Sequence, residues 1–239
     1  RYHRVPDIFD CWFESGAVPF AQHHYPFENR PRIEDYIIRN AAMCDFIAEG
    51  LDQTRGWFYT LHVLATALFN KPAYKNVVCG GLILAADGRK MSKRWGNYTP
   101  PQQVISDFGA DALRLYMLRL PATYAEASCF KDAEIRTDTK TIIQWVNSIR
   151  FLLEHIKMYE GVLGLRYTYG KPKSTNPFDQ WIISRLNSTI SKIGDLMSRF
   201  EYTRYVETAY DFIEDYTNWY LKFRSEEHTS ELQSRVDIS

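Results

Sequence analysis

Apolar residues in the first half of the chain occur in short runs separated by glycine, proline and polar residues. Three runs have the length and composition of β-strands, at residues 5–12, 43–48 and 76–84, and the second should be buried. Between the second and third runs, Leu61, Leu64 and Leu68 recur at helical spacing and should face the sheet. This alternation predicts an α/β domain, in which residue Trp12 ends a strand.

The pattern changes near residue 100. Two short helices are predicted, one opened by Pro101 and ending near Gly109, the other over residues 110–118 and ended by Pro121. Beyond about residue 130, three long amphipathic helices replace the strands, with a Gly/Pro/Ser-rich linker at 160–177. The apolar stripes are Ile142, Val146, Ile149, Leu153 and Ile156; Ile182, Leu186, Ile190, Ile193, Met197 and Phe200; and Val206, Ala209, Ile213, Tyr216 and Tyr220. A helical bundle therefore follows the α/β domain.

Composition narrows the functional classes. A chain of 239 residues with 45% hydrophobic content is globular, and no apolar run approaches the roughly 20 residues that span a bilayer. With Lys+Arg 29 against Asp+Glu 29, the chain has no net charge, which gives no sign of a nucleic-acid partner. A prediction of nucleic-acid binding must therefore rest on local basic patches. Cys11, Cys44, Cys79 and Cys129 lie far apart, which argues against zinc and disulfides and favours reduced, buried thiols.

The segment at residues 87–97 carries the clearest chemistry. Lys90 and Lys93 lie three residues apart in a loop that also holds Ser92 and is flanked by Gly88 and Gly96. Two cations, a hydroxyl and backbone N–H groups suit a polyphosphate, so a mobile lid over ATP is predicted, with Met91 anchoring it on the apolar body. An isolated Lys-x-x-Lys would more often be a solvated loop.

Residues 49–58 (Glu-Gly-Leu-Asp-Gln-Thr-Arg-Gly-Trp-Phe) lie between the second strand and the leucine helix. Gly50 lets the turn close, and Asp52 is the predicted N-cap of the helix. Strand, turn and helix in this order place polar side chains on a ligand at the carboxyl edge of a parallel sheet. A ligand site is therefore predicted here.

The second long helix carries Arg185, Lys192 and Arg199, each seven residues from the next, which form one basic edge. Such a row can follow a phosphate backbone. It can equally be a solvated flank, which the residues alone favour.

The stretch at 224–239 is polar and lacks helical periodicity. Its sequence is what one reading frame of a common sequencing-library adapter encodes. Either it is a reading artefact or it is a disordered tail, and resequencing across Phe223 distinguishes the two.

Several motifs together resemble the class I isoleucyl-tRNA synthetases. These are residues 90–94 (Lys-Met-Ser-Lys-Arg), 49–58, 10–16 (Asp-Cys-Trp-Phe-Glu-Ser-Gly) and 109–114, with the bundle segments 145–152, 181–186 and 218–220. Arg94, where bacterial members usually carry Ser, resembles the eukaryotic cytosolic branch. The resemblance implies the C-terminal half of a Rossmann-like catalytic domain at 1–130 and a partial anticodon-binding domain at 131–223.

This resemblance also implies roles for individual residues. Lys93, Lys90 and Ser92 would be catalytic and contact the departing phosphates. Trp12 and Trp57 would wall the amino-acid pocket, and Arg185, Lys192 and Arg199 would bind tRNA. The adenylate would be held by Glu49, Gly50, Asp52, Gln53, Met91 and Lys93. No metal-ligand cluster is visible in the sequence, although Mg²⁺ would accompany ATP.

The implied function is ATP-dependent attachment of isoleucine to its tRNA in the cytoplasm. Other synthetases in a multi-synthetase assembly are implied partners, and no membrane is. The family's His-x-Gly-His segment and editing domain do not occur in this sequence, so the chain alone should be inactive. The alternatives are a valyl- or leucyl-specific relative and a non-catalytic tRNA-binding fragment. Measuring which amino acid supports ATP–pyrophosphate exchange distinguishes an isoleucine enzyme from a valyl- or leucyl-specific relative. An in-frame upstream half-domain with His-x-Gly-His argues against a non-catalytic fragment.

Overall fold

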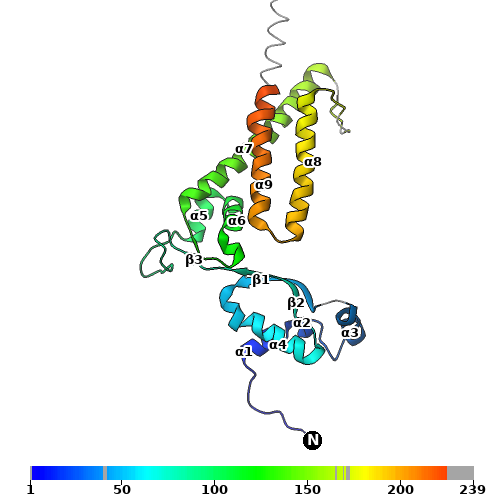
Figure 1. The fold of residues 1–239 in the computed structure, drawn as a ribbon, viewed down its shortest axis with the longest axis vertical. Coiled ribbons are helices and arrows are strands. Elements are labelled where there is room, and N and C mark those ends of the chain that lie inside the picture. The colour runs from blue at the N-terminus through cyan, green and yellow to red at the C-terminus, as the bar shows by residue number, and fades with distance from the viewer. Residues whose placement is uncertain (1, 40–41, 165, 169, 171–172, 225–239) are drawn as a thin grey trace, which may run out of the picture. The chain divides into compact units, whose positions relative to one another are not determined.

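A computed structural model describes residues 2–39, 42–164, 166–168, 170 and 173–224 (Figure 1). The chain divides into two compact units, each described by itself below. The first comprises residues 1–83 and 121–128, and the second comprises residues 84–120 and 129–239, in each case as far as the structure describes them. The lysine-containing loop belongs to the second unit, together with the helices that follow it.

The first unit is a β-α-β arrangement with additional short helices. Strands β1 (Cys44–Gly50) and β2 (Tyr74–Gly80) pair in parallel, from Cys44 opposite Tyr74 to Gly50 opposite Gly80. They are connected by the 3-10 helix η1 (Leu51–Arg55) and helix α4 (Trp57–Phe69). Helices α1 (Cys11–Gly16), α2 (Val18–Ala21) and α3 (Arg30–Arg39) precede β1. The predicted small parallel sheet with a connecting helix is confirmed.

The core of this unit shows which predicted faces pack. Its buried members include Phe20, Ile37, Ile47 and Leu61. Helix α4 contributes Phe58, Leu61 and Ala65, whereas Leu68 is 59% exposed. The predicted leucine stripe was therefore wrong at its C-terminal end. Strand β1 was also predicted to be buried, but only Ile47 within it is, because β1 pairs with β2 alone among the described residues.

The strand predicted at residues 5–12 was wrong. Residues 5–10 form no strand, and Val5 and Ile8 are exposed. Helix α1 begins at Cys11 because the Asp10 carboxylate accepts the N–H of Trp12 at 2.8 Å. The local cap prevails because no described strand pairs with this segment. Trp12 therefore lies in a helix instead of at a strand end.

The strand predicted at 76–84 is divided into β2 and β3 (Ile83–Leu84). The break occurs where the chain passes close to the 3-10 helix η2 (Pro121–Tyr124) and the residues after it. The N–H of Gly81 donates to the carbonyl of Ala122 at 2.7 Å, and a Cβ at Gly81 would lie 2.0 Å from the carbonyl oxygen of Glu126. Only glycine fits there. Strand β3 then pairs with β4 (Ser128–Cys129).

The second unit is helical after its loop. Helices α5 (Pro101–Phe108) and α6 (Ala110–Arg119) lie where the sequence predicts them. They are followed by α7 (Asp132–Leu163), α8 (Pro177–Ser198), α9 (Tyr202–Glu214) and a π-helical segment, Asp215–Leu221. None of the helices in the described part of the chain combines the length and apolarity that crossing a membrane requires.

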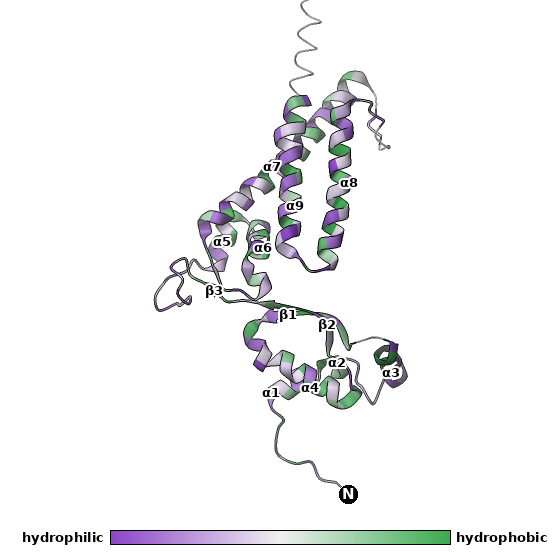
Figure 2. Ribbon diagram, in the orientation of Figure 1, coloured by the Kyte–Doolittle hydropathy of each residue, from purple (hydrophilic) through white to green (hydrophobic). Residues whose placement is uncertain are grey.

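The packing faces of the bundle match the prediction only for α9. There the predicted Val206 is buried and the rest of the predicted stripe is half-buried. On α8 the buried residues are Ile182, Thr189 and Leu196, seven apart; Ile182 was predicted, whereas the predicted Leu186, Ile190 and Met197 are exposed. Figure 2 shows apolar residues recurring along α8, so more than one face could have been chosen for packing. On α7 the predicted Val146, Ile149 and Leu153 are about half exposed.

The last described residue also departs from the prediction. Arg224, assigned to the tail, continues the terminal helix, and its Nε lies 3.1 Å from Asp179 Oδ1. That ion pair joins it to α8, so Arg224 belongs with the bundle. The remainder of the predicted tail lies outside the described residues.

Helices α6, α7 and α9 meet at a fully buried carboxylate. Asp138 has no exposed surface, and its Oδ1 lies 2.6 Å from Arg119 Nη1 and 2.7 Å from the Tyr210 hydroxyl. Burial, followed by the hydrogen bond to Asp138, raises the pKa of Tyr210, so its hydroxyl stays a donor at neutral pH. Each helix thus supplies one member of a charged network.

We expect Asp138→Ala to lower the free energy of unfolding by about 3–5 kcal/mol, because it leaves the partly buried Arg119 without its carboxylate. Urea unfolding measures the change. Asp111→Ala is the matched control, since the Asp111–Arg114 pair is 79% exposed on both sides and should contribute nothing measurable. Equal stability of the two variants would contradict the assignment.

Candidate functional site

Predicted ligand-binding residues gather at one pocket in the first unit. The pocket has a volume of about 450 Å³ and is lined by Trp12, Ser15, Val18, Glu49, Gln53 and Trp57. Four of these six were predicted from the sequence. They come from α1, the carboxyl end of β1, η1 and the start of α4. The end of a parallel strand thus forms part of a pocket, as expected for α/β folds.

The two indoles are held by backbone contacts between α1 and α4. The Trp57 Nε1–H donates to the carbonyl of Ser15 at 2.9 Å. A Cβ at Gly16 would lie 2.9 Å from the backbone of Thr60, and a Cβ at Gly56 would lie 3.2 Å from the Trp12 ring. Glycines at both positions let α1 approach α4 closely. The pocket therefore has two aromatic walls, of which the Trp57 indole is fixed by a hydrogen bond.

The polar residues of the pocket differ in how they are bound. Glu49 is exposed, and its carboxylate has no hydrogen bond or ion pair within the described residues. Gln53 accepts the N–H of Trp57 through Oε1 at 2.9 Å and donates from Nε2 to Asp52 at 3.3 Å. Glu49 is thus free to accept hydrogen bonds from a ligand, while Gln53 is fixed by the protein.

Asp52 was predicted to be the N-cap of α4, but the structure shows that it is not. It lies within η1, and α4 begins at Trp57, whose N–H is capped by Gln53. The 3-10 helix inserts five residues between β1 and α4, so the capping position moves toward the C-terminus. A Cβ at Gly50 would lie 2.7 Å from Asp52 Oδ1, a contact that rotation of the Asp52 side chain could relieve.

The lysine loop, residues 85–97 of the second unit, is a structured hairpin. The N–H of Ala85 donates to the carbonyl of Arg89 at 2.8 Å, and Gly88 turns the chain with φ +78°. Asp87 accepts the N–H of Arg89 at 3.0 Å, which lowers the pKa of Asp87. The Arg89 guanidinium lies 5.5 Å from the centre of the Trp95 ring.

Both predicted phosphate-binding lysines are exposed at this loop. Neither Lys90 nor Lys93 has a side-chain partner in the part of the chain that the structure describes. The Ser92 N–H is bound by Asn97 Oδ1 at 2.9 Å, and the Asn97 amide donates to the Lys90 carbonyl at 3.2 Å. The sequence analysis missed Asn97. The sequence did hold a signal for its role, because an asparagine that follows a glycine in a turn often hydrogen-bonds to the backbone of that turn.

A cavity of about 460 Å³ lies behind the loop. Met91, Gly96 and Asn97 line it from the loop, and Phe130 and Ala133 line it from the segment that begins α7. Met91 therefore lines this cavity, and its role as an anchor of the loop stays a prediction. The remaining lining residues are Ala85, Ala86, Tyr98, Thr99, Lys131 and Asp132.

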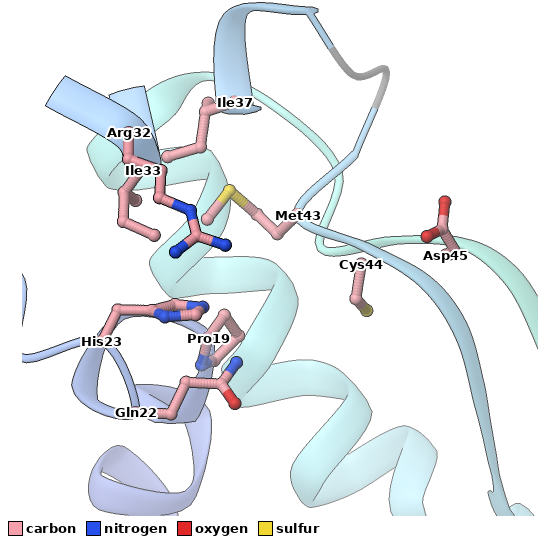
Figure 3. Close-up of a pocket in the computed structure, with 9 residues that line it drawn as sticks. All are labelled: Pro19, Gln22, His23, Arg32, Ile33, Ile37, Met43, Cys44 and Asp45. Atoms are coloured by element: carbon pink, nitrogen blue, oxygen red, sulfur yellow. The ribbon is translucent and has the colours of Figure 1, made fainter. Parts of the chain in front are cut away.

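A further cavity in the first unit, of about 340 Å³, contains none of the predicted site residues. Figure 3 shows its lining, which comes from α2, the loop after it, α3 and the start of β1. Within the described residues, no group of three His, Cys, Asp or Glu side chains could hold a metal ion. The four cysteines are all unpaired.

The predicted basic edge of α8 is partly occupied by ion pairs. Arg185 is turned toward the π-helical segment, where its Nη2 lies 2.6 Å from Asp215 Oδ2. Arg199 lies 2.6 Å from Asp195 and 3.3 Å from Glu201. Lys192 alone of the three has no partner in the described chain. Acidic residues of α8, of the turn before α9 and of the π-helical segment thus neutralise two of the three cations on the predicted edge.

Two family models match the chain. The model of tRNA synthetases class I (I, L, M and V) matches residues 1–129, more than half of the 239 residues. The model of the anticodon-binding domain of tRNA ligase matches residues 179–236. The second match continues beyond residue 224, past the described residues, into the tail that the adapter interpretation concerns.

Relatives with assigned names are similar over most of this chain. The cytoplasmic isoleucine–tRNA ligase of Schizosaccharomyces pombe is 44% identical, over 92% of this chain and 21% of its own length. The isoleucine–tRNA ligase of Protochlamydia amoebophila is 46% identical, over 92% of this chain and 20% of its own length. The chain thus spans about a fifth of the length of these relatives.

Solved structures support the fold. LeuRS of Agrobacterium radiobacter K84, in a ternary complex with tRNA and LeuAMS, has a TM-score of 0.67 at 19% identity, over 88% of this chain and 26% of its own. Mycobacterium tuberculosis methionyl-tRNA synthetase with methionyl-adenylate has a TM-score of 0.52 at 18% identity, over 72% and 32% of the two chains.

We expect Gln53→Ala to lower the free energy of unfolding by about 1 kcal/mol, since Gln53 caps the Trp57 N–H at the start of α4. Asp52→Ala, one residue away and exposed, should change it by less than about 0.5 kcal/mol. Urea unfolding of both variants checks this. A larger loss for Asp52→Ala would restore it as the cap.

Proposed function

Since the chain belongs to the class I tRNA synthetases for isoleucine, leucine, methionine and valine, we propose that it acts in attaching isoleucine to its tRNA. The chain spans about a fifth of its relatives, so the activity is proposed for a longer protein that contains it. In the first step an isoleucine carboxylate oxygen bonds to the α-phosphorus of ATP and pyrophosphate leaves. In the second, a hydroxyl of the terminal tRNA adenosine takes the acyl group and AMP leaves.

The observation that carries this proposal is the pocket of Trp12, Glu49, Gln53 and Trp57. Two indoles suit the walls of a site for a branched aliphatic side chain. The unpaired carboxylate of Glu49 suits the two ribose hydroxyls of an adenylate, because an ionised carboxylate only accepts hydrogen bonds. Gly50, Asp52 and Gln53 shape the turn that holds Glu49.

The lysine loop supplies the second part of the proposal. Lys90 and Lys93, exposed and without side-chain partners in the described chain, would neutralise the phosphates of ATP, with Lys93 on the departing pyrophosphate. Ser92 would assist, and Met91 would hold the loop on the apolar body. Phosphoryl chemistry of this kind depends on positioning and charge.

The described residues contain no group of three His, Cys, Asp or Glu side chains that could hold a metal ion by themselves. Any Mg²⁺ would be bound through the phosphates of ATP and water. We assign no step to it.

The domains and partners follow from the same family. Residues 1–130 would be the second half of the catalytic domain, and residues 131–223 part of a tRNA-binding bundle. The names of the relatives favour a cytoplasmic protein, and association with other synthetases is a further possibility to test by co-purification. Within the family, amino-acid-dependent exchange distinguishes isoleucine from valine or leucine as substrate. An upstream His-x-Gly-His half-domain distinguishes the enzyme from a non-catalytic tRNA-binding fragment.

We expect Lys93→Ala in the full-length protein to lower ATP–pyrophosphate exchange by about two orders of magnitude or more, because a charge on the departing phosphates is lost. Isoleucine binding, measured by calorimetry, should persist. Lys140→Ala, an exposed lysine on α7, is the control and should exchange at the wild-type rate. Unchanged exchange in the Lys93 variant would refute the role.

We propose that the bundle binds tRNA, with Lys192 contacting phosphate and Arg185 and Arg199 acting mainly through their ion pairs. Lys192→Glu should weaken tRNA binding and reduce the salt dependence by about one phosphate contact, without changing the melting temperature. Arg185→Glu should lower the melting temperature, because it places a second carboxylate beside Asp215. Filter binding at several salt concentrations, with thermal unfolding, measures both. Normal tRNA binding by Lys192→Glu would remove Lys192 from the interface.

A further inference from the structure

Asn97 connects two backbone groups on either side of Met91. Its Oδ1 accepts the N–H of Ser92 at 2.9 Å, and its Nδ2 donates to the carbonyl of Lys90 at 3.2 Å. Both groups belong to residues that we place on the phosphates of ATP. A single side chain therefore sets the spacing of the backbone between Lys90 and Ser92.

The rest of the loop brings Asn97 into this position. The carbonyl of Ser92 accepts the N–H groups of Trp95 at 3.2 Å and Gly96 at 3.0 Å, which closes a tight turn. Gly96 has φ +57°, a conformation that glycine adopts without strain, and returns the chain toward Lys90. Lys93 lies within this closed turn.

A cavity of about 460 Å³ lies behind the loop, lined by Met91 and Asn97 of the loop and by Phe130 and Ala133. A loop that is backed by a cavity depends more on its own hydrogen bonds than a densely packed core segment does. In this loop, the two bonds of Asn97 join its end to its middle, at Lys90 and Ser92.

We propose that Asn97 is a positioning residue for adenylate formation. Asn97 fixes the turn before ATP binds, so the loop does not have to become ordered when Lys90 and Lys93 meet the phosphates. Asn97 does not itself contact ATP. Ordering the cations before substrate arrives lowers the barrier of the chemical step. This inference rests on the proposed function, since it gives the two lysines their task.

The test uses Asn97→Ala in the full-length protein. We expect kcat for ATP–pyrophosphate exchange to fall about 10- to 100-fold, as two hydrogen bonds that order the loop are lost, with KM for isoleucine nearly unchanged. Asn76→Ala is the matched control. Its amide donates to the Asp45 carbonyl at 2.9 Å, which is also a side-chain bond to backbone but lies outside the loop. Its exchange rate should equal that of the wild type.

A second measurement reports the conformation of the loop directly. Hydrogen exchange of the Ser92 amide should be accelerated in Asn97→Ala. It should remain slow in Asn97→Asp, because the carboxylate still accepts that N–H. Asn97→Asp therefore also keeps the test available if the alanine variant fails to fold.

The outcomes separate this inference from the function on which it rests. If Lys93→Ala loses exchange activity and Asn97→Ala does not, the positioning role is overturned and the proposed function stands. If Lys93→Ala also retains activity, both are overturned. An Asn97→Ala variant that loses activity while its Ser92 amide stays as protected as in the wild type also overturns the positioning role.

Discussion

The buried Asp138 carboxylate is the interaction on which the second unit depends. It accepts hydrogen bonds from Arg119 of α6 and Tyr210 of α9, and it belongs to α7. Its second oxygen, Oδ2, is buried and has no hydrogen-bond partner among the described residues, so the network is only partly satisfied there. A buried charge of this kind contributes less to net stability than to fixing which surfaces meet, because removing either partner leaves the other desolvated. The arrangement of three helices is thereby tied to one residue.

The pocket in the first unit obtains its rigidity in a different way. In the part of the chain that the structure describes, no ion pair lies between the elements that carry Trp12 and Trp57. Instead, glycines at positions 16 and 56 allow close contact between elements, and a backbone carbonyl accepts the Trp57 indole N–H. The carboxylate of Glu49 is left unpaired in the described chain. A hydrogen-bonding group that has no partner within the protein is available to bind a ligand.

The lysine loop is held by backbone hydrogen bonds and by one side chain, that of Asn97. Backbone groups close the turn around Lys93, and the side chain of Asn97 joins its two ends. The cations themselves remain without protein partners in the described residues. Binding energy from a polyphosphate would therefore not be spent on breaking existing ion pairs. Arg185 and Arg199 are the opposite case, since acidic neighbours already neutralise them.

The sequence by itself determined the α/β-to-helical transition and the strand, turn and helix around residues 44–69, because periodicity and glycine-containing turns are local signals. The Asp10 cap that starts the helix containing Trp12 was also a local signal, which the strand prediction overlooked. Tertiary structure decided which face of α8 is buried and the division of one predicted strand at Gly81. It also decided the role of Asp138, which lies in a polar stretch that reads as solvated surface until Arg119 and Tyr210 meet it. These outcomes depend on residues distant in sequence, and no local pattern encodes which partner will be there.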